Sequence, residues 1–445
     1  MTTLITRIKK NIPILIAGIL FACTQLAHAS PEIQHWQNAQ GSQVFFVAAP
    51  ELPMVDIRIT FDAGSARDGN KPGLALMTNG LLAEGAGKLD ANAIAERFED
   101  IGAKFRNNAD RDTASLSLRS LSDTQWLKPA VDNFVTVLSE PNFPGIALER
   151  ERQRALIALR GEKQSPQSLS SNAFYANIYN DHAYAAPTLG YEENMATLAR
   201  GDIQTFYQKY YTASNATIAI VGDLDRKEAE SLANTLTAKL KKGEKPAAIK
   251  PVAYTLKNKQ IHIEYPSTQT HIMVGMPSHI RGDKDHFALF VGNHVLGGGG
   301  FGSRITKAIR EDRGLAYSAY SYFAPMRAQG PFVVGLQTSN TQTKEALQVL
   351  NETVATFIKE GPDDNELAAA KRDIVNGFPL RIASNSSVLN YVSLIGFYGL
   401  PLDYLNEFTE KVDNITKEQV REAFANRIKL DQLLTVTVGQ STDEG

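Results

Sequence analysis

The 445-residue sequence has little cysteine, little net charge and few long hydrophobic runs. Its single cysteine excludes an intramolecular disulfide framework and any zinc site built from several thiolates. The 46 basic residues nearly balance the 48 acidic ones, so no excess of positive charge favours nucleic acid or an anionic membrane as a partner. Beyond the N-terminal region, no stretch approaches the ~20 apolar residues that a membrane-spanning helix needs. What remains is a globular composition, 43% hydrophobic and 21% charged, in a chain long enough for two domains.

Residues 1–29 are typical of a secretory signal peptide. Basic residues at Arg7–Lys10 precede the apolar run Ile12–Ala22, and small residues end at Ala29, where a signal peptidase would cleave. We therefore expect export to the periplasm. The alternative is a lipoprotein signal with a lipid anchor on Cys23, but the bulky Phe21 fits that pattern poorly, so cleavage after Ala29 is the preferred interpretation.

The remainder of the chain contains one internal repeat. Thr217–Asp223 (TIAIVGD) is echoed by Leu434–Gln440 (LTVTVGQ), and Asn79–Gly85 (NGLLAEG) is echoed by Asn293–Gly299 (NHVLGGG). A repeat with a period of this size indicates two copies of one structural unit. We expect an N-terminal domain over 30–240, a lysine-rich linker with two prolines over 241–260, and a C-terminal domain over 261–445.

Strands and helices mix within each half without strict alternation. Period-two patterns predict strands at Met54–Phe61, 111–119, 271–276, 316–323 and 332–338. An apolar stripe predicts a helix that Asp90 caps, and Ser303 is expected to cap a later helix that Gly314 ends. These patterns predict the α+β class, with two homologous domains that each hold a mainly antiparallel sheet covered on one face by helices.

Several short motifs follow one another along both halves. They are Gly73-Leu-Ala, Leu89-Asp-Ala, Glu149-Arg-Glu, Thr188-Leu-Gly, Val221-Gly-Asp and Arg310-Glu-Asp-Arg-Gly-Leu-Ala-Tyr317. Their order resembles the pitrilysin/insulinase family of zinc peptidases, most closely the branch with mitochondrial processing peptidase and short bacterial two-subunit peptidases. The resemblance covers nearly all of the mature chain. It implies one half of a clam-shaped chamber, completed by a second subunit.

The metal site of that family is missing its ligands here. The family binds zinc through His-x-x-Glu-His on a helix, with a later Glu as the third ligand. The matching positions hold Leu76, Asn79 and Gly80, and the third ligand falls near Ile157 or Ala158. Leu cannot bind zinc and Asn cannot accept a proton from water, so we expect no metal in this chain and zinc in a partner subunit. The other mature histidines lack the spacing of a ligand pair.

The second half keeps a different part of the family pattern. In the family an Arg on a helix and a Tyr seven residues later reach the substrate, and they match Arg310 and Tyr317. Both side chains donate hydrogen bonds that could hold a scissile carbonyl and stabilise its oxyanion. The structural alternative is an Arg that binds a helix C-terminus and a Tyr packed in the core.

The resemblance therefore implies the non-catalytic, substrate-binding subunit of a heterodimeric periplasmic zinc metallopeptidase. Such a subunit is inactive alone, binds extended peptides, and supplies Arg310 and Tyr317 in trans to a homologous partner that carries His-x-x-Glu-His. A non-proteolytic binding or scaffold protein with the same fold is the alternative. A third hypothesis is a self-sufficient hydrolase with an unrecognised site.

Overall fold

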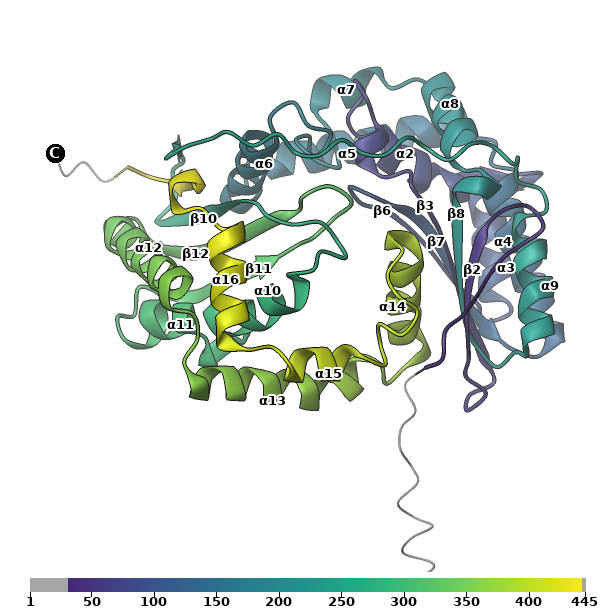
Figure 1. The fold of residues 1–445 in the computed structure, drawn as a ribbon. Coiled ribbons are helices and arrows are strands. Elements are labelled where there is room, and N and C mark those ends of the chain that lie inside the picture. The colour runs from purple at the N-terminus through teal and green to yellow at the C-terminus, as the bar shows by residue number, and fades with distance from the viewer. Residues whose placement is uncertain (1–30, 442–445) are drawn as a thin grey trace, which may run out of the picture.

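The computed structural model describes residues 31–441, which form two halves of similar architecture (Figure 1). The predicted signal peptide and Cys23 lie outside the described residues. Within the described part, no helix is both long enough and apolar enough to cross a membrane.

The first half is built on a six-stranded sheet with the order β1-β2-β8-β3-β7-β6. Neighbouring strands are antiparallel except β2 and β8, which run parallel. The strands are β1 (Gln34–Gln37), β2 (Gln43–Ala48), β3 (Met54–Phe61), β6 (Lys104–Ala109), β7 (Ala114–Leu121) and β8 (Ala216–Gly222), with a small hairpin of β4 (Gly85–Ala86) and β5 (Leu89–Asp90) beside them. Strand β3 has the predicted bounds, and its Val55, Ile57 and Ile59 are buried in one core while the residues between them face the other way.

Helices cover the apolar face of this sheet. They are α2 (Leu74–Leu81), α3 (Ala91–Glu99), α4 (Thr124–Ser139), α5 (Gly145–Glu162), α7 (Glu192–Thr197), α8 (Arg200–Tyr210) and α9 (Arg226–Thr237). The predicted cap of α3 is confirmed, because the Asp90 carboxylate accepts a hydrogen bond from the Ala93 N–H at 2.9 Å. The face beneath these helices forms the first hydrophobic core.

The second half repeats the arrangement with the strand order β11-β12-β10-β13-β9, the same as β6-β7-β3-β8-β2 in the first half. Its strands are β9 (Gln260–Glu264), β10 (Gln269–Pro277), β11 (Ala316–Phe323), β12 (Pro331–Ser339) and β13 (Leu434–Gly439). Its helices are α10 (His286–Asn293), α11 (Arg304–Thr306), α12 (Thr343–Glu360), α13 (Asp364–Arg381), α15 (Phe408–Asp413) and α16 (Lys417–Arg427). The predicted α+β fold of two homologous domains is confirmed.

Each half also contributes one helix that packs on the sheet of the other half. Helix α6 (Pro166–Tyr179) packs on β10 and β13 of the second half, and α14 (Asn385–Tyr398) packs on β2, β3 and β8 of the first (Figure 1). The expectation that only one face of each sheet is covered was therefore wrong. The apolar residues of β2 and β8 on this second face explain the contact, since Phe45, Val47 and Val221 share a core with α14.

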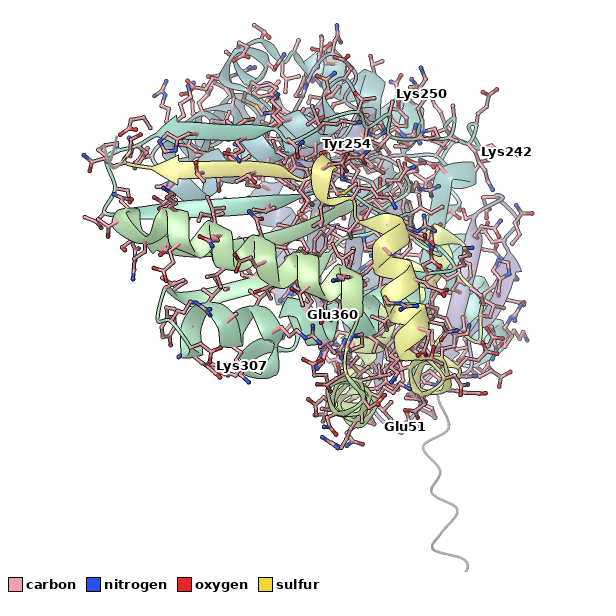
Figure 2. All side chains as sticks on the ribbon, turned by 60° about the vertical axis from the view of Figure 1, so that its left-hand side comes forward. Glu51, Lys242, Lys250, Tyr254, Lys307 and Glu360 are labelled. Carbon is pink, nitrogen blue, oxygen red and sulfur yellow. The ribbon has the colours of Figure 1, made fainter. Side chains whose placement is uncertain are left out.

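Residues 241–259, which connect the halves, contain no helix or strand. Lys242 and Lys250 lie on the outer surface, whereas Tyr254 lies next to the C-terminal elements (Figure 2). The Tyr254 hydroxyl donates to the Gln432 carbonyl at 2.6 Å, and Val252 packs with Tyr254 against the core beneath α6. The connection is thus an ordered strap along the second half.

Candidate functional site

Helix α2 carries the positions that match the family's zinc motif, and its start is held by a buried carboxylate. Asp68 accepts hydrogen bonds from the Gly73 N–H at 2.8 Å and the Ala75 N–H at 2.7 Å. Gly73 has a φ of 96°, and a Cβ there would lie 2.7 Å from the Leu189 carbonyl oxygen. Only glycine suits this position, so the local sequence places α2 firmly against the first half.

The side chains at the motif positions serve the fold. Leu76 packs against the first core, and Gly80 is exposed. Asn79 is 2% exposed and donates to the Tyr211 hydroxyl at 3.2 Å and to the Ser115 carbonyl at 3.3 Å. Burial raises the pKa of that Tyr211 phenol well above its ordinary range, so the hydroxyl stays neutral as the acceptor for Asn79.

The residues at this site do not fit zinc. Near the expected third-ligand position, Ile157 points away from the core and is 67% exposed. Leu, Asn, Gly and Ile offer no imidazole, thiolate or carboxylate to the metal. Among residues 31–441, no three His, Cys, Asp or Glu side chains gather closely enough to hold a metal ion.

Arg310 lies at the end of a short irregular helix. The π-helical turn Lys307–Glu311 continues α11, and such turns are frequent at functional sites. Gly314 ends the helix as predicted, with a φ of 62° and its N–H donating to the Arg310 carbonyl at 3.0 Å. The predicted cap at Ser303 was wrong in detail, because its hydroxyl donates to the Gly300 carbonyl and accepts no backbone N–H.

Arg310 is held between two aromatic rings. Its guanidinium carbon lies 4.5 Å from the ring centre of Tyr317 and 4.7 Å from that of Phe301. Cation–π contacts of this kind fix the side chain without using its N–H donors. Within the described residues, the Arg310 side chain makes no hydrogen bond or ion pair, so these donors remain available to another molecule.

Tyr317 is presented by a strand irregularity. The pairing of β11 with β12 shifts between Ala316 and Ala319, where one extra residue is accommodated. A bulge at a sheet edge re-aims a side chain out of the regular alternation. Tyr317 is 82% exposed, which is not the position of a core tyrosine.

The structure brings Arg310 and Tyr317 together but separates them from the degenerate zinc motif. Helices α2 and α11 lie in different halves of the molecule (Figure 1). Phe301, which completes the stack, was not predicted from the sequence. Its only local signal was an aromatic residue directly after the glycine run 297–300.

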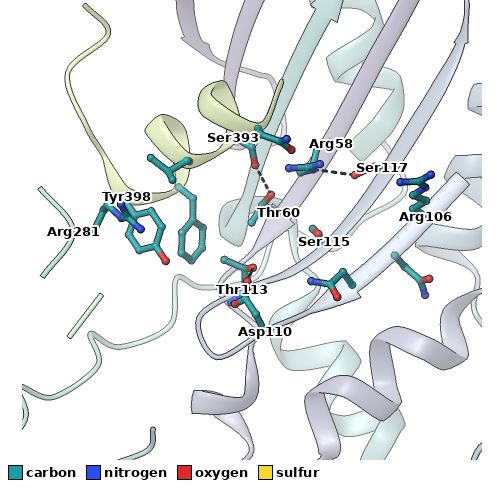
Figure 3. Close-up of a pocket in the computed structure, with 15 residues that line it drawn as sticks. Arg58, Thr60, Arg106, Asp110, Thr113, Ser115, Ser117, Arg281, Ser393 and Tyr398 are labelled. Atoms are coloured by element: carbon teal, nitrogen blue, oxygen red, sulfur yellow. Dashed lines mark hydrogen bonds between the residues drawn. The ribbon is translucent and has the colours of Figure 1, made fainter. Parts of the chain in front are cut away.

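A polar cavity lies beside α14, on the face of the first sheet that this helix covers, here called the inner face (Figure 3). Its accessible volume is about 500 Å³. Arg281 and Tyr398 lie at one end and Arg106 at the other, with Arg58 and the hydroxyls of β3 and β7 between them. This cavity was not predicted from the sequence. The alternating pattern of β3 and β7 does place Arg58 and Ser117 on the polar faces of their strands, but it does not show that they line a cavity.

Comparison with known proteins agrees with this geometry. Residues 43–192 match the insulinase (peptidase family M16) model, and residues 197–374 match the peptidase M16 inactive domain. A crystal structure of a peptidase M16 inactive domain from Pseudomonas fluorescens is 39% identical, with a TM-score of 0.90 over 93% of this chain and 99% of that one. A curated relative from Helicobacter pylori, the non-peptidase homolog YmxG, is 26% identical over 96% of this chain and 97% of its own length. A protease structure from Helicobacter pylori shares the fold, with a TM-score of 0.83 at 18% identity over 92% of this chain and all of that one. The chain belongs to the insulinase family, peptidase family M16, as a non-catalytic member.

Proposed function

We propose that this chain is the substrate-binding subunit of a heterodimeric zinc metallopeptidase in the periplasm. The partner is a homologous subunit with His-x-x-Glu-His that holds the zinc, and the substrates are extended peptides. This chain contributes Arg310 and Tyr317 in trans and is inactive alone. The location rests on the signal-peptide pattern of residues 1–29.

One observation carries the proposal. The chain presents an Arg–Tyr pair with free donors at an exposed surface, while its own zinc-motif positions hold no ligand. Arginine and tyrosine are also among the residue types that dominate binding at protein interfaces. Helix α2 lies in the first half and the pair in the second, which supports a role for the pair at a site other than the degenerate zinc motif.

The chemistry follows from the donors. The Arg310 guanidinium has five N–H groups and the Tyr317 phenol has one O–H. Aimed at a scissile carbonyl, they would bind the oxygen more strongly as negative charge develops on it. The flanking rings keep the guanidinium in place, so little side-chain entropy is lost when the oxyanion forms.

The test is the substitution Arg310→Ala in the purified two-chain complex. Loss of an oxyanion donor is expected to lower turnover by ~10²–10³ with the complex intact. Arg313→Ala is the matched control, because this exposed arginine lies three residues away and, within residues 31–441, donates only to the Ala308 carbonyl. Equal turnover in the Arg310 variant and the control would refute the role of the pair.

The partner itself is tested by purifying the tagged chain from its native envelope. A one-to-one partner with His-x-x-Glu-His is the expected result. Assembly with unrelated envelope proteins would instead favour the scaffold function. Stoichiometric zinc and peptidase activity in the isolated chain would favour the self-sufficient hydrolase.

A further inference from the structure

The inner face of the first sheet carries two neighbouring rows of polar side chains with different charge balance. In one row, Asp56 on β3 faces Arg119 on β7, which in turn faces Lys104 on β6, and Asp56 and Arg119 form a bidentate ion pair at 2.7 and 2.9 Å. In the next row, Arg58 on β3 and Arg106 on β6 flank Ser117 on β7. That second row contains two cations and no carboxylate. The positive charge of the second row is therefore not neutralised within that row.

Arg58 is the less exposed of the two arginines. Among the described residues its side chain makes one hydrogen bond, from Nε to the Ser117 hydroxyl at 2.9 Å (Figure 3). Burial lowers the pKa of the Arg58 guanidinium, and the nearby Asp56 only partly opposes this effect. A half-buried cation with most of its donors unmatched is costly unless an anion completes the site.

Arg281 brings a third guanidinium to the opposite end of the cavity. It lies over the Tyr398 ring at 5.5 Å, and its buried Nε has no hydrogen-bond acceptor in the described part of the chain. Burial lowers the pKa of this guanidinium as well. Arg281 comes from the second half, so the cavity is lined with cations from both halves.

The one acidic residue that lines the cavity is already engaged. The Asp110 carboxylate accepts hydrogen bonds from the Asp112 N–H at 2.9 Å and the Thr113 N–H at 2.7 Å, and from the Thr113 hydroxyl at 2.9 Å. The remaining polar lining consists of amides and hydroxyls, which can donate. The cavity therefore offers donors and positive charge to whatever enters it.

Strand β6 indicates what form the anion takes. It is the outermost strand of the sheet, paired only with β7 in the described structure. A peptide that adds to this open edge forms backbone hydrogen bonds with β6, and alternate side chains then face the cavity. One of those side chains would stand directly opposite Arg106, in the row that continues to Ser117 and Arg58.

We propose that this cavity, lined by Arg58, Arg106 and Arg281, binds the carboxylate of an acidic side chain in an extended peptide. The subunit thus selects peptides with Asp or Glu at the position that faces Arg106. That such peptides are substrates rests on the proposed peptidase function. The binding preference itself requires neither zinc nor turnover.

The test compares two fluorescein-labelled twelve-residue peptides of alternating Thr and Gln that differ at one central position, which holds Glu in one peptide and Gln in the other. Their affinities are measured by fluorescence anisotropy for the isolated mature chain and for its complex with the partner. The Glu peptide is expected to bind about tenfold more tightly, the range of one charge-assisted hydrogen-bonded contact. Arg106→Gln and Arg58→Gln are each expected to abolish most of this preference.

Lys104→Gln is the matched control, because Lys104 is an exposed cation on the same strand that does not line the cavity. It should leave the preference in place. Should Arg58→Gln fail to fold, the exposed Arg106 still decides the question. Equal affinity for the two peptides, binding of neither, or equal effects of Arg106→Gln and Lys104→Gln would overturn the proposal. These outcomes are independent of the Arg310 test, so a failed peptidase function and a failed anion site are distinguishable.

Discussion

At the scale of single residues, the carboxylate of Asp112 joins the two halves. Asp112 is 2% exposed in the turn between β6 and β7, and it accepts hydrogen bonds from the hydroxyls of Tyr184 and Tyr398 and from the Arg327 N–H. Tyr398 and Arg327 belong to the second half. Burial, followed by the charge of Asp112, raises the pKa of the Tyr398 phenol far above its ordinary range, which keeps its proton on the hydrogen bond.

Replacing Tyr398 by Phe removes one donor from this buried charge. A hydrogen bond to a charged group contributes about 1.5–3 kcal/mol, so we expect a loss of that size in the free energy of unfolding. Urea denaturation measures it. Tyr391→Phe, on the same helix, is the control, because the Tyr391 hydroxyl makes no hydrogen bond within residues 31–441, and it should change stability by less than about 0.5 kcal/mol.

Two buried histidines predict a pH dependence. Burial, reinforced by Arg427 and Arg281, lowers the pKa of His279 to about 4, and burial with Arg281 and His279 lowers that of His286 to about 3, against a partial opposing effect of Asp285 and Asp283. Both rings are therefore neutral in the folded chain at a pH where the unfolded chain, with a pKa of 6.5, binds protons. Stability must fall as the pH drops below about 6.5, by up to ~1.4 kcal/mol per pH unit for each ring.

The substitution His286→Phe removes the contribution of one of these two rings to the pH dependence of stability. Its neighbours Phe287, Phe290 and Tyr404 are aromatic, so the new ring has suitable surroundings. The slope of unfolding free energy against pH, measured by urea titration between about pH 7 and 5, should become shallower by up to ~1.4 kcal/mol per unit. A slope equal to that of the parent would contradict the assignment.

At the scale of elements, the exchanged helices approach their sheets at glycines. A Cβ on Gly396 of α14 would lie 2.6 Å from the Phe45 ring and 2.8 Å from the Thr217 methyl group. A Cβ on Gly275 of β10 would lie 2.9 Å from the Phe174 ring of α6 and 2.0 Å from the Phe332 carbonyl oxygen. At both places where a helix of one half covers the sheet of the other half, a glycine allows the helix and the sheet to lie in close contact.

Gly396→Ala is expected to destabilise the chain by about 1–3 kcal/mol, because overpacking at this contact outweighs the better helix propensity of alanine. Gly377→Ala supplies the opposite control, since Gly377 lies within α13 and a Cβ there meets no atom within 4 Å. That variant should gain about 0.5–1 kcal/mol. Thermal unfolding of the two variants beside the parent checks both signs, and equal shifts would contradict the packing argument.

Sequence patterns predict these elements well but not their exchange. The strand Met54–Phe61 and the cap at Asp90 depend on residues close together in the chain, and both were predicted correctly. An apolar helical stripe does not say which sheet it covers, so the positions of α6 and α14 could not be predicted. The row of Arg58, Ser117 and Arg106 could not be predicted either. The registers of β3, β7 and β6 that align these residues are set by pairing between segments far apart in the chain.

At the scale of the whole molecule, the two halves are held together by the two helices, α6 and α14, that each pack on the sheet of the other half. The core beneath α14 combines Phe45, Val47 and Val221 of the first half with Ile395 of the second. The core beneath α6 combines Phe174 and Ile178 of the first half with Val436 of the second. Neither sheet can bury its second face from its own half, although each half has its own complete strand order.

We therefore expect neither half to fold stably alone and the two to assemble when expressed together. A break within residues 241–248, in the exposed part of the strap, gives fragments that begin or end outside every helix and strand. Each isolated fragment would expose the apolar face that the other half covers, at ~25 cal/mol for each Å² of apolar surface left in water. Co-purification and a single cooperative unfolding transition of the paired fragments are the expected results. Cooperative unfolding of either fragment alone would mean that the reciprocal helices are not what unites the molecule.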